Sequence, residues 1–240
     1  MKTDTEFTIR LATEEDIPAL HALIEASVRG LQAGDYTQAQ IDGALGTVLG
    51  LDTQLIRDRT YFVAEELADG EEHRSGAKAH ADSAGPSLGI NPRPTGRVSF
   101  SAACKAPASF VGSGVGAEAL TCRSLAGCGG WSKRKTLFGA DQGPGREPDL
   151  LDPAKDAAKV RAIFVHPRFA RRGLGTLILA RVEAEARATG FRRYEMGSTL
   201  TGVPLYRLKG YVEVERIAVP LKNGEALPVV RMVKLVTDAA

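Results

Sequence analysis

Residues 166–186, "HPRFARRGLGTLILARVEAEA", hold the side chains best suited to binding an anion. Arg171 and Arg172 come immediately before Gly173 and Gly175, and a helical pattern follows without a break. The first amides of a helix have no partner within it, and the aligned peptide dipoles place partial positive charge there. Glycine lets an anion approach the backbone, and arginine adds charge that a diphosphate can use. This stretch predicts a phosphate site at the start of a helix.

The sequence offers little or no support for two other phosphate-binding motifs. No Gly-Lys-Ser/Thr follows residues 166–186, which excludes a Walker loop. The segment "GSGVGAEA" (112–119) is similar to a dinucleotide fingerprint, but no clear strand precedes it and no periodic helix follows. A nucleotide-binding module remains the competing hypothesis from a different class. The bland alternative for residues 171–173 is a solvated turn with a packing glycine.

The elements around the predicted phosphate site have clear patterns. Residues 158–167 are nearly continuously apolar after Arg161, as in a central strand. A helix over 173–189 follows directly, and Gly190 is well placed to end it. The apolar face of this helix consists of Leu174, Leu177, Ile178, Val182 and Ala186.

The rest of the chain alternates strand and helix signals. Thr13 with Asp16 and Thr37 with Gln40 have the spacing of capping pairs, and each predicts the start of a helix. Period-2 or β-branched runs predict strands at 7–11, 60–66, 125–134 and 191–198, a short helix ends at Gly210, and a closing hairpin turns at Asn223-Gly224. Glycines and prolines predict a loop over 139–153.

Residues 68–124 differ from the rest in composition. They are rich in Ala, Gly and Ser, with few large apolar side chains and no sustained period. Such a segment buries too little apolar surface to offset its ordering entropy. We therefore expect a single domain over 5–240 that is interrupted at 68–124 by a low-complexity, disordered insertion. Translated non-coding sequence, such as a retained intron, has the same compositional signature.

The bulk composition excludes several classes of protein. The net charge is +2, so nothing in it points to a nucleic-acid or membrane partner. No transmembrane run or secretory signal is visible, and the cysteines (Cys104, Cys122 and Cys128) are odd in number, which predicts a reducing, cytoplasmic location. The histidines are scattered, so no metal site is expected.

Two motifs resemble those of the GNAT superfamily of N-acetyltransferases. "VHPRFARRGLGT" is similar to the acetyl-CoA motif of that family, with Gly173 and Gly175 at its small positions and Ala170 where Arg or Gln is usual. "LYRLKGY" is similar to the family's Tyr-x-x-x-Gly-Phe/Tyr segment, carried by Tyr206, Gly210 and Tyr211. The resemblance covers roughly 7–66 and 125–235.

The resemblance implies an α/β fold: a mixed, mostly antiparallel sheet, flanked by helices, whose central strands (159–165 and 191–197) splay apart. It implies acetyl-CoA as cosubstrate and no metal. The pantetheine would pair with the backbone of Ile163, Phe164 and Val165. The diphosphate would lie on the amides of Arg171, Arg172, Gly173, Leu174, Gly175 and Thr176.

The resemblance also implies the chemistry: an amine attacks the thioester directly. Tyr206 would protonate the leaving thiolate, since a phenol with a pKa of about 10 is a reasonable donor. Glu195 is the best candidate for the base, with His166 as a weaker one. Trp131 and Cys128 are expected to line or back the acceptor side.

The acceptor itself does not follow from the residues. The candidate acceptor loops, 31–37 and 134–157, are neither strongly acidic nor strongly basic. We expect an acetyl-CoA-dependent N-acetyltransferase that acts on a primary amine of a small molecule or peptide, as a monomer or homodimer. The alternative is a non-catalytic relative that binds acyl-CoA as a sensor or partner.

Overall fold

A computed structural model describes residues 7–67, 125–143 and 146–236. The described residues form one compact unit. In chain order the elements are β1 (Phe7–Leu11), η1 (Glu14–Asp16), α1 (Ile17–Leu31), α2 (Gln38–Ala44), α3 (Thr53–Arg57), β2 (Tyr61–Glu66), β3 (Leu125–Ser132), β4 (Ala158–Val165), η2 (Pro167–Phe169), α4 (Leu174–Ala188), β5 (Arg193–Thr199), η3 (Leu200–Gly202), α5 (Val203–Leu208), β6 (Val212–Pro220) and β7 (Ala226–Leu235).

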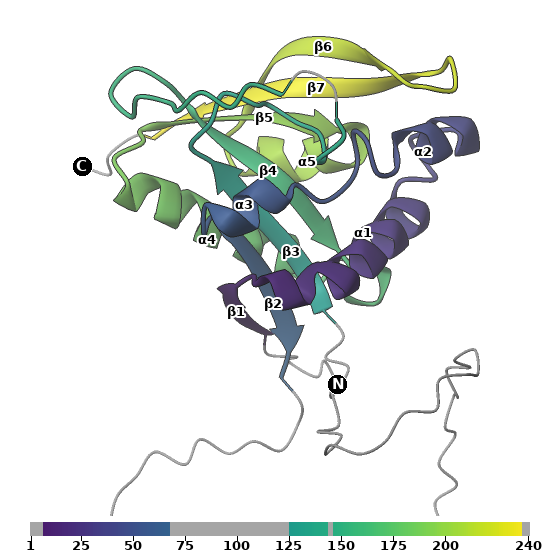
Figure 1. The fold of residues 1–240 in the computed structure, drawn as a ribbon, viewed down its shortest axis with the longest axis horizontal. Coiled ribbons are helices and arrows are strands. Elements are labelled where there is room, and N and C mark those ends of the chain that lie inside the picture. The colour runs from purple at the N-terminus through teal and green to yellow at the C-terminus, as the bar shows by residue number, and fades with distance from the viewer. Residues whose placement is uncertain (1–6, 68–124, 144–145, 237–240) are drawn as a thin grey trace, which may run out of the picture. The chain divides into compact units, whose positions relative to one another are not determined.

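The strands form one seven-stranded sheet in the order β1-β2-β3-β4-β5-β7-β6. Every neighbouring pair is antiparallel except β4 and β5, which are parallel. Helices α1 and α3 lie in front of the sheet in Figure 1, and α4 and α5 lie behind it. This is the mixed, mostly antiparallel sheet flanked by helices that the resemblance implied, and the fold prediction is confirmed.

The centre of the sheet opens between β4 and β5. Their pairing is restricted to Ala158 with Tyr194 and Lys159 with Glu195, so the strands separate beyond that point. On its other edge β4 pairs with β3, with a bulge where Ala162 and Ile163 face a single residue of β3. Ala162 has a φ of 51°, a left-handed backbone that an alanine rarely adopts. The predicted splay of the central strands is therefore present.

The glycines of β3 make room for side chains from its neighbours. A Cβ on Gly130 would come within 2.6 Å of the Tyr61 ring, and one on Gly129 within 2.6 Å of Ile178 and 2.8 Å of Ile163. The absence of these Cβ atoms lets helix α4 and the β2 side chains pack closely against the strand. This explains a glycine-rich sequence in a strand that is buried throughout.

Several local predictions are confirmed. The Thr37–Gln40 capping box opens α2, and the turn at Asn223-Gly224 joins β6 to β7, with Gly224 at a φ of 85°. Gly190, at a φ of 99°, follows the end of α4. Helix α3 was not predicted, because its short sequence has no periodic apolar face. Residues 139–143 and 146–153 have no helix or strand beyond a single bridge residue, as expected.

Some sequence predictions fall outside the described residues. These are the insertion at 68–124, the "GSGVGAEA" segment within it, Cys104 and Cys122. Within the described ranges, no helix is long and apolar enough to span a membrane. The same part of the chain holds no cluster of His, Cys, Asp and Glu that could bind a metal.

Candidate active site

A groove of about 660 Å³ lies where α4 begins, between the end of β4 and α5. It collects most of the residues predicted to bind the cofactor: Val165, Arg171, Gly173, Leu174, Gly175 and Thr176. Leu31 at the end of α1 and Leu205 on α5 complete its walls. The strand, turn and helix that are consecutive in the sequence thus form one concave surface.

The backbone of this turn is arranged for an anion. Arg171 and Gly173 have φ values of 62° and 84°, which turn the chain from η2 into α4. In the described chain, none of the amides of residues 171–176 donates to a protein acceptor, whereas Leu177 N returns to the helical pattern by donating to Gly173 O at 3.1 Å. A Cβ on Gly173 would meet nothing within 4 Å, so it is the backbone conformation that favours glycine here.

The two arginines of the turn have different surroundings. Arg171 is exposed and lines the groove. The Arg172 guanidinium lies over the rings of Phe7 and Phe169, 5.8 and 5.7 Å from their centroids, and is not among the residues of the groove. Of the predicted pair, only Arg171 is therefore placed to reach a ligand in the groove from its present position.

A second, smaller cavity of about 70 Å³ lies in the opening between β4 and β5. Its lining includes Ile163 and Phe164 of the bulged strand, residues 196–199 of β5, and Tyr206 of α5. Because β4 pairs with β5 only at its first two residues, the rest of the β4 edge that faces this opening has no partner among the described strands. Phe164 lines this central cavity, and Val165, the next residue of β4, lines the groove.

Tyr206 is the predicted proton donor, and its side chain is buried against the central cavity. Burial raises the pKa of Tyr206 above its ordinary value, because the phenolate would lose hydration. Its hydroxyl has no hydrogen-bond partner among the described residues, and its ring packs edge-on against Tyr211 at 5.8 Å. The phenol is thus protonated at neutral pH and free to donate.

The bulge in β4 is held from the far side of the neighbouring strand. Tyr61 is fully buried on β2, and its hydroxyl donates to the carbonyl of Ala162 at 3.0 Å. The same hydroxyl lies 3.1 Å from Cys128 Sγ. Burial raises the pKa of Cys128 to about 12, so the thiol stays protonated. Cys128 supports the bulge and is not among the residues that line either cavity.

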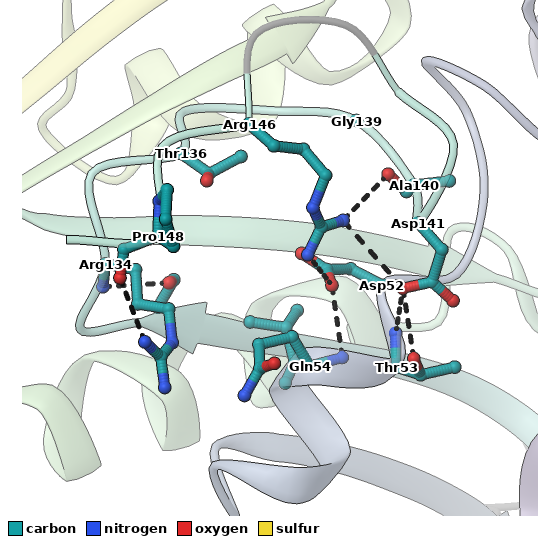
Figure 2. A network of polar contacts seen from close by, with 12 residues as sticks. Asp52, Thr53, Gln54, Arg134, Thr136, Gly139, Ala140, Asp141, Arg146 and Pro148 are labelled. Carbon is teal, nitrogen blue, oxygen red and sulfur yellow. Dashed lines mark hydrogen bonds and ion pairs between the residues drawn. The ribbon is translucent and has the colours of Figure 1, made fainter. Parts of the chain in front are cut away.

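The wall of the central cavity on the 134–157 side is anchored by buried charges. Arg161 on β4 donates to Asp52 at 3.0 Å and to the carbonyls of Thr136 and Gly139 at 2.9 and 2.5 Å. Arg146 donates to the same carboxylate at 3.1 Å and to the carbonyl of Ala140 (Figure 2). These contacts tie residues 137–139, which line the cavity, to the start of α3.

Glu195, the predicted base, does not reach the site. Its carboxylate is paired with both Lys159 and Arg231 and lines neither the groove nor the central cavity. Although burial opposes ionisation, the hydrogen bonds from Lys159 and Arg231 hold the pKa of Glu195 below its ordinary value. A carboxylate that is paired with two cations is a poor proton acceptor, so Glu195 has a structural role.

The remaining candidates also have structural surroundings. His166 caps η2, its Nδ1 accepting from the Arg168 amide at 3.2 Å. Trp131 is buried in the core, where its ring packs edge-on against Phe191 at 5.7 Å. Trp131 and Cys128 were expected to line or back the acceptor side; neither of them lines the central cavity, and Cys128 lies behind it, in contact with Tyr61, which donates to the carbonyl of the lining residue Ala162.

Gln32 lies in the predicted acceptor loop 31–37, but the sequence did not single it out as a site residue. Gln32, directly after α1, is 6% exposed and lines this cavity. Within the described chain, its Oε1 is the single buried side-chain oxygen or nitrogen without a hydrogen-bond partner. Nothing in the local pattern "LQAGDY" marks Gln32, because its position depends on the packing of α1 across the sheet.

Comparison with known proteins agrees with this geometry. Residues 152–235, which include β4, α4, β5 and α5, match the family described as "Acetyltransferase (GNAT) domain". The chain is similar in structure to a GCN5-related N-acetyltransferase from Rhodopseudomonas palustris, with 15% identity, a TM-score of 0.54 and coverage of 98% of this chain and 99% of that one.

Two further solved structures are similar at lower scores. A putative acetyltransferase from Salmonella typhimurium, solved with acetyl-CoA, has 16% identity, a TM-score of 0.48 and coverage of 98% and 97%. The PaiA N-acetyltransferase from Thermoplasma acidophilum, solved with coenzyme A, has 10% identity, a TM-score of 0.48 and coverage of 96% and 99%. No curated relative matches the chain.

Residues 152–235 match a GNAT acetyltransferase domain, and the described chain has the fold of a GCN5-related N-acetyltransferase, so the resemblance seen in the motifs is confirmed. Acetyl transfer is the general activity that the match supports.

Proposed function

We propose that this protein transfers the acetyl group of acetyl-CoA to a primary amine by direct attack of the amine on the thioester. The observation that carries the proposal is the run of amides over residues 171–176 that have no partner among the described residues; it opens onto a groove beside the part of β4 that pairs with no described strand on that side. A diphosphate satisfies such amides, and an extended amide-containing chain satisfies a free strand edge. Coenzyme A contains both groups in one molecule.

The donor side of the proposal uses the residues of the groove. The diphosphate would bind the amides from Arg171 to Thr176, with the partial positive charge at the start of α4 and the Arg171 guanidinium nearby. The pantetheine would follow β4 past Val165 toward Phe164 and Ile163, which line the central cavity. The thioester would then lie beside Tyr206.

The chemical step would take place in the central cavity. The amine nitrogen forms a bond to the acetyl carbon, the carbon–sulfur bond breaks, and the thiolate takes the proton of Tyr206. The amine loses its surplus proton to water, and Tyr206 is later reprotonated from water. In the described chain no carboxylate or imidazole lines this cavity, so we propose that the amine enters in its neutral form.

The experiment has a binding arm and a turnover arm. Calorimetry with acetyl-CoA tests the groove, and thiol release from acetyl-CoA with a panel of amines (ethanolamine, benzylamine, spermidine and trialanine) tests the reaction. Tyr206→Phe keeps the ring and removes the donor. We expect its turnover to fall by about 10²-fold or more, the usual contribution of a general acid, with acetyl-CoA affinity little changed.

Two outcomes would contradict the proposal, and a third would contradict only the role of Tyr206. No binding of acetyl-CoA would remove the donor side. Binding without thiol release on any amine would favour the non-catalytic, acyl-CoA-binding alternative. Full turnover in Tyr206→Phe at neutral pH would leave the direct attack intact but assign protonation of the thiolate to water.

A further inference from the structure

The side-chain oxygen of Gln32, which has no hydrogen-bond partner among the described residues, points to a ligand. A buried polar atom without a hydrogen bond destabilises the folded state, so such atoms are rare and usually have a functional reason. Gln32 is more than nine-tenths buried, and its Oε1 is left without a partner while its side chain lines the central cavity.

Most of the other buried polar side chains that line this cavity already have hydrogen-bond partners within the protein. The Arg161 guanidinium is held by Asp52 and by the carbonyls of Thr136 and Gly139. Ser198 donates its hydroxyl to the carbonyl of Thr199 at 2.8 Å. Gln32 and Tyr206 are left, one an acceptor and the other a donor.

The position of Gln32 is fixed by the elements on either side. The main-chain amide of Gln32 continues the pattern of α1 by donating to Val28 O at 3.1 Å. Its main-chain carbonyl accepts from the amides of Asp35 and Tyr36. The Tyr36 hydroxyl then ties this loop to β7 and η3, through Pro228 O at 2.7 Å and the Leu200 amide at 2.8 Å. Hydrogen bonds therefore fix the backbone from which the Gln32 side chain extends.

We propose that Gln32 positions the acceptor amine, its Oε1 accepting one N–H of the amine that attacks the thioester. This proposal rests on the proposed function. An acetyl thioester carries no donor at its reacting end, so the partner of a carbonyl oxygen here must come from the acceptor. A neutral primary amine has two N–H bonds and one lone pair, and donating one N–H to Gln32 leaves the lone pair for the acetyl carbon.

A change in the free energy of unfolding distinguishes a glutamine that binds a ligand from one that stabilises the fold. Gln32→Met has a similar size and removes the unpartnered oxygen, so the stability of the free protein should not fall. The matched control is Gln54→Met on α3, where Nε2 donates to Asp58 at 3.0 Å. Losing that hydrogen bond should lower stability slightly and leave acetyl transfer unchanged.

The kinetic test uses whichever amine of the panel (ethanolamine, benzylamine, spermidine or trialanine) the wild-type protein acetylates best. We expect Gln32→Met to lower kcat/KM for that amine by about tenfold, the value of one hydrogen bond, with acetyl-CoA affinity unchanged. Gln32→Glu keeps an acceptor oxygen at this position and should retain amine binding, with a lower KM and a lower kcat, because a carboxylate holds the amine as ammonium.

The outcomes distinguish this inference from the proposed function. If wild-type protein acetylates none of the amines, the proposed function fails and this inference falls with it. If the wild type is active but Gln32→Met keeps its amine kcat/KM within about twofold, the inference alone is wrong. It is also overturned if Gln32→Met unfolds more easily than wild type, or if Gln32→Glu loses amine binding as fully as Gln32→Met.

Discussion

Asp52 is the carboxylate on which the buried charges beside the central cavity depend, and replacing it tests how that wall is held. Its side chain is 3% exposed and that of its partner Arg161 is 2% exposed. Asp52 also caps α3, accepting from the Gln54 amide at 3.1 Å. Asp52→Asn keeps a capping oxygen, because asparagine is as good an N-cap as aspartate, but it removes the charge and replaces the oxygen that accepts from Arg161 with an NH2 donor.

The expected loss in free energy of unfolding depends on which partners Arg161 keeps after the substitution. Burial already lowers the pKa of Arg161 from its ordinary value, and the charge of Asp52 opposes this. Breaking a buried ion pair by removing one partner costs about 3–5 kcal/mol, because the remaining charge is uncompensated. The carbonyls of Thr136 and Gly139 still accept from Arg161, so we expect Asp52→Asn to lower the free energy of unfolding by about 3 kcal/mol.

The assay is urea unfolding followed by circular dichroism. The matched control is Asp58→Asn, whose partner Arg134 is 26% exposed and can be rehydrated, so we expect a loss of about 1 kcal/mol. In the background of Arg161→Met the same Asp52→Asn change should cost much less, since no buried charge is left unpaired. The reasoning is refuted if Asp52→Asn costs no more than the control, or costs the same in both backgrounds.

Three further predictions concern the turn before α4, the tyrosines and residues 68–124. Gly173→Glu should retain the fold at a cost of about 1–2 kcal/mol for a left-handed side-chain residue and should abolish acetyl-CoA binding; unchanged affinity by calorimetry would show that the site is misassigned. All five tyrosines (Tyr36, Tyr61, Tyr194, Tyr206 and Tyr211) have pKa values raised mainly by burial. The folded state therefore keeps protons that the unfolded state releases above about pH 10, so stability should be full below that pH and fall above it, by at most about 1.4 kcal/mol per tyrosine per pH unit; a free energy of unfolding that is flat from about pH 8 to about pH 11 would contradict this. Glu65 of β2 pairs with Leu125 of β3, so the chain ends that flank 68–124 meet at neighbouring positions; replacing 68–124 with an Asn-Gly turn should give a folded protein that binds acetyl-CoA, and loss of folding would show that the segment is required.

The sequence by itself determined the elements whose causes are local. The turn at residues 171–173, the helix after it and the Asn223-Gly224 hairpin depend on residues close together in the chain, such as a glycine at positive φ or a run of apolar residues. These features need no distant partner to specify them, and the structure has each where the pattern predicted it. The order of such local motifs was also enough to predict the GNAT fold.

The contents of the central cavity were decided by tertiary structure alone. Parallel pairing places Lys159 beside Glu195. Because of this register, and not because of its residue type, the Glu195 carboxylate forms an ion pair and does not line the central cavity. The bulge at Ala162 depends on a hydroxyl two strands away, and Gln32 enters the cavity only because α1 packs across the sheet. Contacts between residues far apart in the chain depend on how the layers pack, and no local propensity or spacing encodes that packing.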